Sequence, residues 1–523
     1  METLLAGPLA NIAQSLANEK PFGQWAFINA CTQTRYERRL RLLIDLLPEA
    51  GALLDALCVA EAQSRHCVLA DPTVRTAINA AIAHFKLDKP VQNPEEFISI
   101  FRLAKEFLQT NSSISALEAG SPEGLRIGPG EAMIWCNDHA SDVAGQAFRR
   151  LLHTYVSDLE FRTPQGETLE MLREGTRLLY DLFPDLAASV FKHVRVVAIG
   201  GPTVDWERWQ LRKKGFSLDS ATLFDIPATI FIAPSVLTSP WQAAEYLLHE
   251  CLHQKWYDLR HTHFMLRRGY QSDESPLIRS LWNVSPPGNP NDWPVCRSLA
   301  AFHVYVHLGL YFSALMQCPP VLIERYGSFD RVESALMARR SFDRAHYLGA
   351  QVRKSRTELG TAGEQFLEWL FAALHRLDPT PPPADAHVHL LLDLYERQVF
   401  QIRRMLREAD LRAPESLTAE QATEPACVLA SLINRELGVA EQVLAVATAT
   451  AVSPGERPIS GADLASAFQH TRQQVIDTLR STIPEVFHRS SAQVPDKTLG
   501  QLVQEMVETS SAQIQELTVR LRP

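Results

Sequence analysis

The stretch that decides the fold is "SPWQAAEYLLHECLHQKWYDLRHTHF", residues 239–264. Ser239 before Pro240 is typical of a helix start, because serine caps free N–H groups and proline suits the first helical position. The pattern that follows predicts one long helix. His249 and His253 then lie one turn apart on one face of that helix, where both imidazoles can bind a single ion.

Glu250 completes the pattern HExxH and lies about 100° around the helix from His249. A carboxylate in that place acts on a metal-bound water or orients a ligand. In a chain with 17 histidines, two of them four apart can also arise by chance and be structural. The cap, helix and neighbouring strands that the motif requires are all expected here, so we favour a metal site.

The third ligand separates the classes of HExxH protein. A metzincin has Gly and His where this chain has Trp256 and Leu259, so that class is excluded. A gluzincin takes a glutamate from a second helix. The nearest candidate, Glu274, stands in "QSDESPLIRS" beside a proline, where we expect a charge at the start of a helix instead.

The apolar segment "WPVCRSLAAFHVYVHLGLYFSAL" offers histidines instead. We expect a helix that packs against the first one, with His303 and His307 four apart on one face. A buried histidine is usually a hydrogen-bonded core residue, but two on an apolar face favour His303 as a ligand, with His307 in reserve. Arg297, one and a half turns earlier, is suited to bind a carboxylate, although a surface role at a helix start is the simpler explanation.

The composition is typical of a soluble protein with more than one domain. The 523 residues are 46% hydrophobic and 21% charged, and the net charge of −9 provides no basic field for nucleic acid or an anionic membrane. Residues 300–316 fall short of the roughly 20 residues of a membrane span. The N-terminus lacks a basic region typical of a secretory signal, and the eight cysteines contain no CxxC pair. We therefore expect a cytoplasmic protein with reduced thiols.

Helical periodicity dominates the chain outside a small central region. Two short β-branched stretches near residues 193–200 and 227–233 predict strands next to the HExxH helix. The predicted fold class is mainly α (α+β), a large helical protein with a small zincin-like sheet. Helical patterns occupy residues 34–57, 94–110, 145–161 and 167–194 and the chain after residue 320.

Turn-rich stretches divide the chain. Gly, Pro and Ser gather at residues 118–131, a proline-rich break covers 378–387, and a polar loop covers 450–463. We expect three regions: an N-terminal helical region, 1–125; a metal-binding catalytic core, 126–330; and a C-terminal helical region, 331–523.

The ordered set of segments resembles the αKG-HExxH peptide β-hydroxylases, a family first described as HExxH-containing peptide-modification proteins. The similarity covers about residues 185–320 and is carried by "LFPDLAASVFKHVRVVAI", "ATIFIAP", "LLHECLH", "SLWNVSPP" and "RSLAAFHVYVHL". It implies an oxygenase dependent on iron(II), 2-oxoglutarate and dioxygen. The implied substrate is a ribosomally made precursor peptide with a leader, hydroxylated at a side-chain β-carbon.

The resemblance also implies roles for individual residues. His249, His253 and His303 become the iron ligands, which leaves positions for 2-oxoglutarate and dioxygen. Glu250 then orients ligands rather than serving as a base.

Arg297 becomes the anchor for the distal carboxylate of 2-oxoglutarate. The family pattern has an arginine directly after the loop tryptophan, whereas this chain has Asn283 after Trp282. Arg279 and Arg260 are therefore alternative anchors.

Two other functions compete with the oxygenase. The first is a zinc metallopeptidase in which Glu250 is the general base and Glu274 or another carboxylate is the third ligand. The second is a non-catalytic peptide-binding protein whose HECLH helix is structural. Metal identity and the effect of His303→Ala separate the two enzymes.

Overall fold

The computed structural model divides the chain into two compact units. The first comprises Met1–Ser275 and Val295–Pro379, and the second comprises Pro276–Pro294 and Thr380–Pro523. Both histidine pairs lie in the first unit. The structure describes residues 7–89, 93–110, 126–128, 132–136, 143–156, 159–202, 219–283, 292–380, 390–396, 398, 440, 443, 470, 472–479, 490–491 and 494–520.

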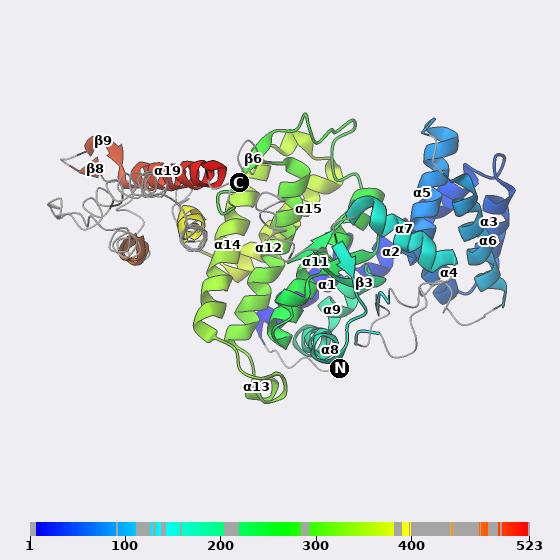
Figure 1. Ribbon diagram of the computed structural model, residues 1–523, viewed down its shortest axis with the longest axis horizontal. Helices are drawn as coiled ribbons and strands as arrows, with labels where there is room; N and C mark the ends of the chain where they lie inside the picture. The colour runs from blue at the N-terminus through cyan, green and yellow to red at the C-terminus, as the bar shows by residue number, and fades with distance from the viewer. Residues whose placement is uncertain are drawn as a thin grey trace, which may run out of the picture. The chain divides into compact units, whose positions relative to one another are not determined.

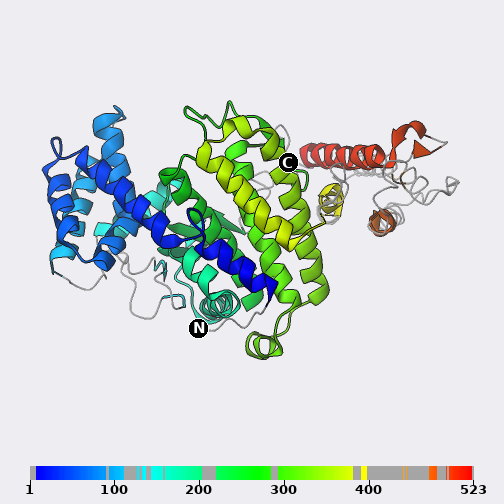
Figure 2. The ribbon, with the colours of Figure 1, turned by 180° about the vertical axis from the view of Figure 1, so that it is seen from behind.

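The first unit is mainly helical around a small mixed sheet, which confirms the predicted fold class (Figures 1 and 2). Its helices are α1 (Pro8–Asn18), α2 (Trp25–Arg41), α3 (Pro48–Val59), α4 (Ala62–Ala70), α5 (Pro72–Lys86), α6 (Pro94–Thr110), α7 (Val143–Val156), α8 (Gly166–Leu182), α9 (Pro184–Phe191), α11 (Pro240–Thr262), α12 (Val295–Met316), α13 (Pro320–Tyr326), α14 (Arg331–Lys354) and α15 (Thr361–Leu377), with short 3-10 turns at Pro234–Val236 and Arg356–Glu358. Its strands are β1 (Met133–Ile134), β2 (Leu159–Phe161), β3 (Val196–Pro202), β4 (Ser220–Thr222) and β5 (Thr229–Ile232).

The sheet is built around β3, and its two predicted strands are β3 and β5. β1 and β5 run parallel to β3, while β2 pairs antiparallel with β3 and β4 pairs antiparallel with β5. All four residues of β5 are buried, as expected for a β-branched strand covered on both faces. β4 lies beyond β5 in the strand order, and α11 contacts both strands.

α11 begins as predicted, with Ser239 as its cap. The Ser239 hydroxyl accepts a hydrogen bond from the backbone N–H of Gln242 at 3.2 Å. Gln254 fixes the helix to the sheet: its side chain accepts from the backbone of Ala228 at 2.9 Å and donates to the carbonyl of Thr229 at 2.7 Å. These two hydrogen bonds, formed where β5 begins, set which face of α11 is turned toward the sheet.

α12 is the apolar helix predicted to pack against α11, and it does so. The Tyr311 hydroxyl donates to the carbonyl of Trp241 at 2.7 Å, which ties the far end of α12 to the start of α11. Among the described helices, only α12 is long and apolar enough to cross a membrane, but 78% of its apolar window is buried inside the protein. That burial is typical of the core helix of a soluble protein.

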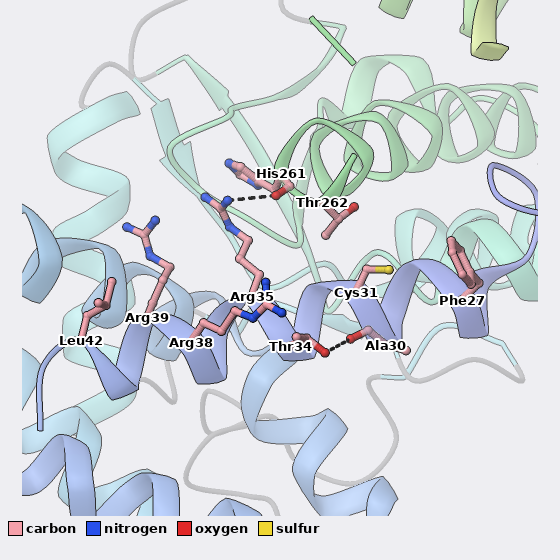
Figure 3. A pocket seen from close by; sticks show the side chains of 10 residues that line it. All are labelled: Phe27, Ala30, Cys31, Thr34, Arg35, Arg38, Arg39, Leu42, His261 and Thr262. Atoms are coloured by element: carbon pink, nitrogen blue, oxygen red, sulfur yellow. Dashed lines mark hydrogen bonds between the residues drawn. The ribbon is translucent and has the colours of Figure 1, made fainter. Parts of the chain in front are cut away.

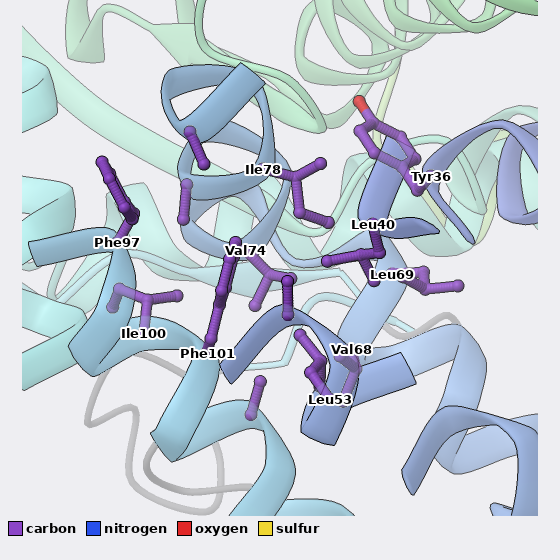
Figure 4. Packing of buried hydrophobic residues seen from close by; sticks show 14 of the residues in the cluster. Tyr36, Leu40, Leu53, Val68, Leu69, Val74, Ile78, Phe97, Ile100 and Phe101 are labelled. Carbon is purple, nitrogen blue, oxygen red and sulfur yellow. The ribbon is translucent and has the colours of Figure 1, made fainter. Parts of the chain in front are cut away.

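The N-terminal helices have an apolar core of their own (Figure 4). Leu40, Val74, Ile78 and Phe101 are among its fully buried members. However, α1 packs on α9 and α15, and α2 packs on α11. The region predicted as residues 1–125 therefore belongs to the same compact unit as α11, because its first two helices pack on the helices around the sheet.

Other expectations changed with the structure. The helix predicted over 145–161 ends at Val156, and its last residues form β2, because Leu159–Phe161 pairs with the end of β3. The breaks at 118–131 and 378–387 lie largely outside the described residues, and the loop at 450–463 lies entirely outside them.

The second unit has a separate apolar core, which includes Tyr395, Leu479, Leu502 and Met506. Its described elements include two pairs of antiparallel strands and a long helix: β6 (Leu277–Arg279), β7 (Asp292–Pro294), β8 (Ser490–Ser491), β9 (Val494–Thr498) and α19 (Leu499–Arg520). Residues 390–396 and 472–479 are also helical. The boundary near residue 380 differs from the predicted one at 331 because α14 and α15 pack on α12 in the first unit.

Candidate metal centre

α11 is buried along most of its length but keeps one stripe partly open to solvent. His249, His253, Tyr257 and Arg260 follow one another along this stripe, whereas the residues between them are buried. Spacings of three and four residues keep these side chains on one helical face. The predicted pair therefore lies on the accessible side of a core helix.

The two imidazoles of this pair are close enough to share an ion. The Nε2 atoms of His249 and His253 are 3.2 Å apart. Two nitrogens bound to one first-row ion at usual bond lengths and angles are about 3.0–3.4 Å apart. The geometry of the pair therefore fits a metal ion.

The protonation of the pair also suits a metal. His249 keeps 31% of its side chain exposed, yet loss of hydration lowers its pKa to about 4. The pKa of His253 lies well below its usual range. Loss of hydration is the largest cause, followed by the neighbouring His249 and the charge of Arg297. Both rings are neutral at pH 7, which is the form that binds metals.

Glu250 is held between the pair and the edge of the sheet. Its Oε1 accepts a hydrogen bond from the Ser220 hydroxyl at 2.5 Å and lies 3.8 Å from Nε2 of His249. Burial raises the pKa of Glu250 to about 7, against the opposing effect of hydrogen bonds with Ser220 and Thr222. Its Oε2 is buried and has no hydrogen-bond partner within the described part of the chain. Near pH 7, Glu250 can therefore gain or lose a proton.

The second histidine pair, on α12, is fully buried. The rings of His303 and His307 meet edge to face, with their centroids 4.6 Å apart. The centroid of the His303 ring is also 5.2 Å from that of Phe366 in α15. Nδ1 of His307 donates to the carbonyl of His303 at 2.8 Å. Neither nitrogen of His303 has a hydrogen-bond partner among the described residues, and nor does Nε2 of His307.

The predicted three-histidine centre is brought together only in part. Across the described ranges, no three side chains of His, Cys, Asp or Glu are grouped so that they could hold one ion. Burial, then electrostatic interactions with His307, Lys255 and His253, lower the pKa of His303. Its role as third ligand stays a prediction.

Glu274, the carboxylate alternative, lies in an exposed turn and accepts a hydrogen bond from Gln271 at 2.7 Å. Our expectation that it begins a helix was wrong. The residues that follow it, Leu277–Arg279, form the strand β6 instead of a helix.

Arg297 lies in the first turn of α12, near the open stripe of α11. Partial loss of hydration lowers its pKa, while Tyr257 exerts the largest opposing effect. The charge of Arg297 in turn acts on His253 and Tyr257. A permanent cation therefore acts on both His253 and Tyr257, which follow one another along the stripe.

The alternative arginines have other roles. The guanidinium carbon of Arg260 lies over the ring of Phe224, 4.7 Å from its centroid. Arg279 belongs to β6 in the second unit and pairs with Asp292 at 3.3 Å. In the loop that departs from the family pattern, Trp282 is buried against Trp293, and Asn283 donates to Ser280 at 2.6 Å.

The buried side of α11 is held by an ion cluster centred on Asp258. Arg75 of α5 contacts Asp258 at 3.1 Å, and Nδ1 of His193 contacts it at 2.7 Å. Burial alone would raise the pKa of Asp258, but Arg75 and His193 outweigh it and lower the pKa to about 2. This cluster fixes the rotation of α11 one turn beyond His253.

The sequence analysis missed three residues of the site. Tyr257 is four residues after His253, so the same periodicity that links the histidines was a signal for it. Ser220 and Thr222 reach Glu250 only because β4 pairs with β5, and Thr222 is also hydrogen-bonded to Tyr257. No local pattern predicts that pairing.

No protein-family model and no curated protein matches this chain.

Proposed function

We propose that this protein is an Fe(II)- and 2-oxoglutarate-dependent oxygenase that hydroxylates a β-carbon of a ribosomally made peptide. The observation that carries the proposal is the combination of a neutral histidine pair, 3.2 Å apart, with the nearby cation Arg297. A dicarboxylate cosubstrate requires both a metal and a fixed positive charge. The proposed location is cytoplasmic.

In this proposal, His249 and His253 hold the iron from the open stripe of α11. His303 is the proposed third ligand: its unpartnered buried nitrogens are costly unless they find a ligand. With 2-oxoglutarate and dioxygen, an iron ion held by these residues would supply the oxidising chemistry that places one oxygen atom in the peptide and the other in succinate, with release of carbon dioxide.

The other residues bind and orient. Arg297 receives the distal carboxylate of 2-oxoglutarate through charge-assisted hydrogen bonds. Glu250, hydrogen-bonded to Ser220 and Thr222, orients groups at the metal rather than passing a proton. The open stripe admits a peptide from solvent.

A zinc metallopeptidase is the second candidate, and a specific observation favours it. Glu250 combines a pKa of about 7, a free Oε2 among the described residues, and a position 3.8 Å from a ligand nitrogen. A general base for hydrolysis needs a pKa of this kind. The activity that Glu250→Gln retains separates the two enzymes.

The experiment that tests the oxygenase measures succinate release at increasing 2-oxoglutarate concentration. We expect Arg297→Gln to raise the apparent KM for 2-oxoglutarate by about tenfold or more, because a charge-assisted bond to carboxylate is lost. Arg260→Gln and Arg279→Gln are matched controls and should change it by less than about twofold. A larger rise in the apparent KM in either control would identify that arginine as the anchor instead. If the wild type released no succinate, the oxygenase proposal would be refuted.

A further inference from the structure

A second candidate site lies between α2 and the last turn of α11. It is a pocket of about 560 Å³, within the usual size range of sites for small molecules. Figure 3 shows Arg35 and Arg39 reaching from α2 toward His261 at the end of α11. His261 is eight residues beyond His253, or about 12 Å along the helix axis, so the pocket is separate from the histidine pair.

Three arginines dominate the lining. Arg35, Arg38 and Arg39 are spaced three and four residues apart, so they share one face of α2 within little more than a turn. All three carry a permanent positive charge. The described lining contains no Asp or Glu, although the chain as a whole has a net charge of −9. The pocket therefore concentrates positive charge on an acidic protein.

Two of these guanidinium groups have unused donors. The Nε atoms of Arg35 and Arg39 are buried, and neither finds a hydrogen-bond partner among the described residues. Arg35 does donate from Nη1 to the carbonyl of His261 at 2.9 Å, which fixes its direction. A buried, charged donor without an acceptor costs free energy, so an anion in this pocket would remove a penalty.

The described residues offer little to neutralise this charge. Asp258 acts on Arg35 from a distance, but its oxygens are already bonded to Arg75 and His193. The other titratable groups in the lining are uncharged at neutral pH, since burial lowers the pKa of His261 to about 3 and raises that of the Cys31 thiol. The lining also contains Phe27 and Leu42, which are 36% and 57% exposed.

We propose that this pocket binds a small organic phosphate. A phosphate group carries up to two negative charges and three acceptor oxygens, which match three adjacent guanidinium groups better than a single carboxylate does. The organic part of the ligand would cover Phe27 or Leu42. This inference does not depend on the function proposed for α11.

The test is isothermal titration calorimetry on the full chain with phenyl phosphate as the probe. We expect Arg35→Gln, Arg38→Gln and Arg39→Gln each to weaken binding by about tenfold or more, since each removes a charge-assisted bond. Arg41→Gln is the matched control, because Arg41 ends the same helix and is exposed but does not line the pocket. It should change binding by less than about twofold.

Two further ligands test the chemical class. Benzoate keeps the ring and replaces phosphate by carboxylate, and it should bind at least about tenfold more weakly than phenyl phosphate. Inorganic phosphate lacks the ring and should also bind more weakly. Failure of phenyl phosphate to bind, benzoate binding equally well, or equal losses in Arg41→Gln and Arg38→Gln would each overturn the proposal. Arg38 is exposed, so its variant remains decisive even if Arg35→Gln does not fold.

Discussion

The protein contains two histidine pairs with the same spacing on two packed helices, and their surroundings differ in every respect that matters for chemistry. His249 and His253 face a partly open stripe, with their Nε2 atoms 3.2 Å apart and a carboxylate beside them. His303 and His307 are fully buried, and the ring of His307 donates a hydrogen bond to the backbone carbonyl of His303. Spacing alone therefore does not define a metal site; access to solvent and the neighbouring groups decide it.

The largest expected effect is on metal affinity, where the two pairs should differ most. His253→Ala should weaken Fe(II) or Co(II) binding by more than about hundredfold, because a ligand contributes more than the groups that only support it. His307→Leu should leave the affinity within about twofold, because the proposed third ligand is His303, although Nε2 of His307 also has no hydrogen-bond partner among the described residues. Anaerobic metal titration with elemental analysis checks both. Equal losses in the two variants would mean that both pairs bind metal.

His303 is the member of the second pair whose pKa responds to His253, and its variant sharpens the comparison. We expect His303→Ala to lose iron and, with it, all 2-oxoglutarate turnover. If iron binding survives and only the free energy of unfolding changes, His303 is a core residue, and the third ligand lies elsewhere. The same titration, run beside a urea denaturation curve, separates loss of metal from loss of fold.

A smaller effect concerns the stability that the Asp258 cluster gives to the buried side of α11, and this effect depends on pH. Asp258 has its pKa lowered from 3.8 to about 2 in the folded protein, so it stabilises the fold fully above about pH 4. That contribution, roughly 2 kcal/mol, is lost as the pH falls through 2. Asp258→Asn should therefore flatten the fall in stability between about pH 4 and 2, measured by urea denaturation. An unchanged pH profile would show that the ion cluster does not hold the helix.

The smallest expected effect is that of Glu250→Gln on an oxygenase. No water needs activation for bond cleavage there, so we expect succinate release to stay within about tenfold of the wild type. A peptidase would instead lose about hundredfold or more, because the glutamate takes the proton from the metal-bound water. Peptide cleavage with zinc that stops in this variant would favour the second candidate.

The sequence predicted the parts of the site that one helix carries. Ser239, Pro240 and the spacing of His249 and His253 are local patterns, and the helix forms as they indicate. The strands β3 and β5 were also predicted, because their β-branched residues are buried on both sides, whereas β4, which contacts the same helix, was not.

What the sequence could not predict depends on contacts between distant segments. The hydrogen bond of Ser220 to Glu250 follows from strand pairing. The bonds of Asp258 to Arg75 and His193 join residues 183 and 65 positions apart. The N-terminal helices were assigned to a region of their own because no local feature reveals that α2 packs on α11.

The most direct test of the central claim is anaerobic addition of Fe(II) and 2-oxoglutarate to the full-length protein, followed by absorption spectroscopy. If the pair on α11 holds iron that 2-oxoglutarate chelates, a metal-to-ligand charge-transfer band will appear in the wild type and in His307→Leu, and it will be absent in His253→Ala. Bound Fe(II) without this band, or a band that persists in His253→Ala, would contradict the account.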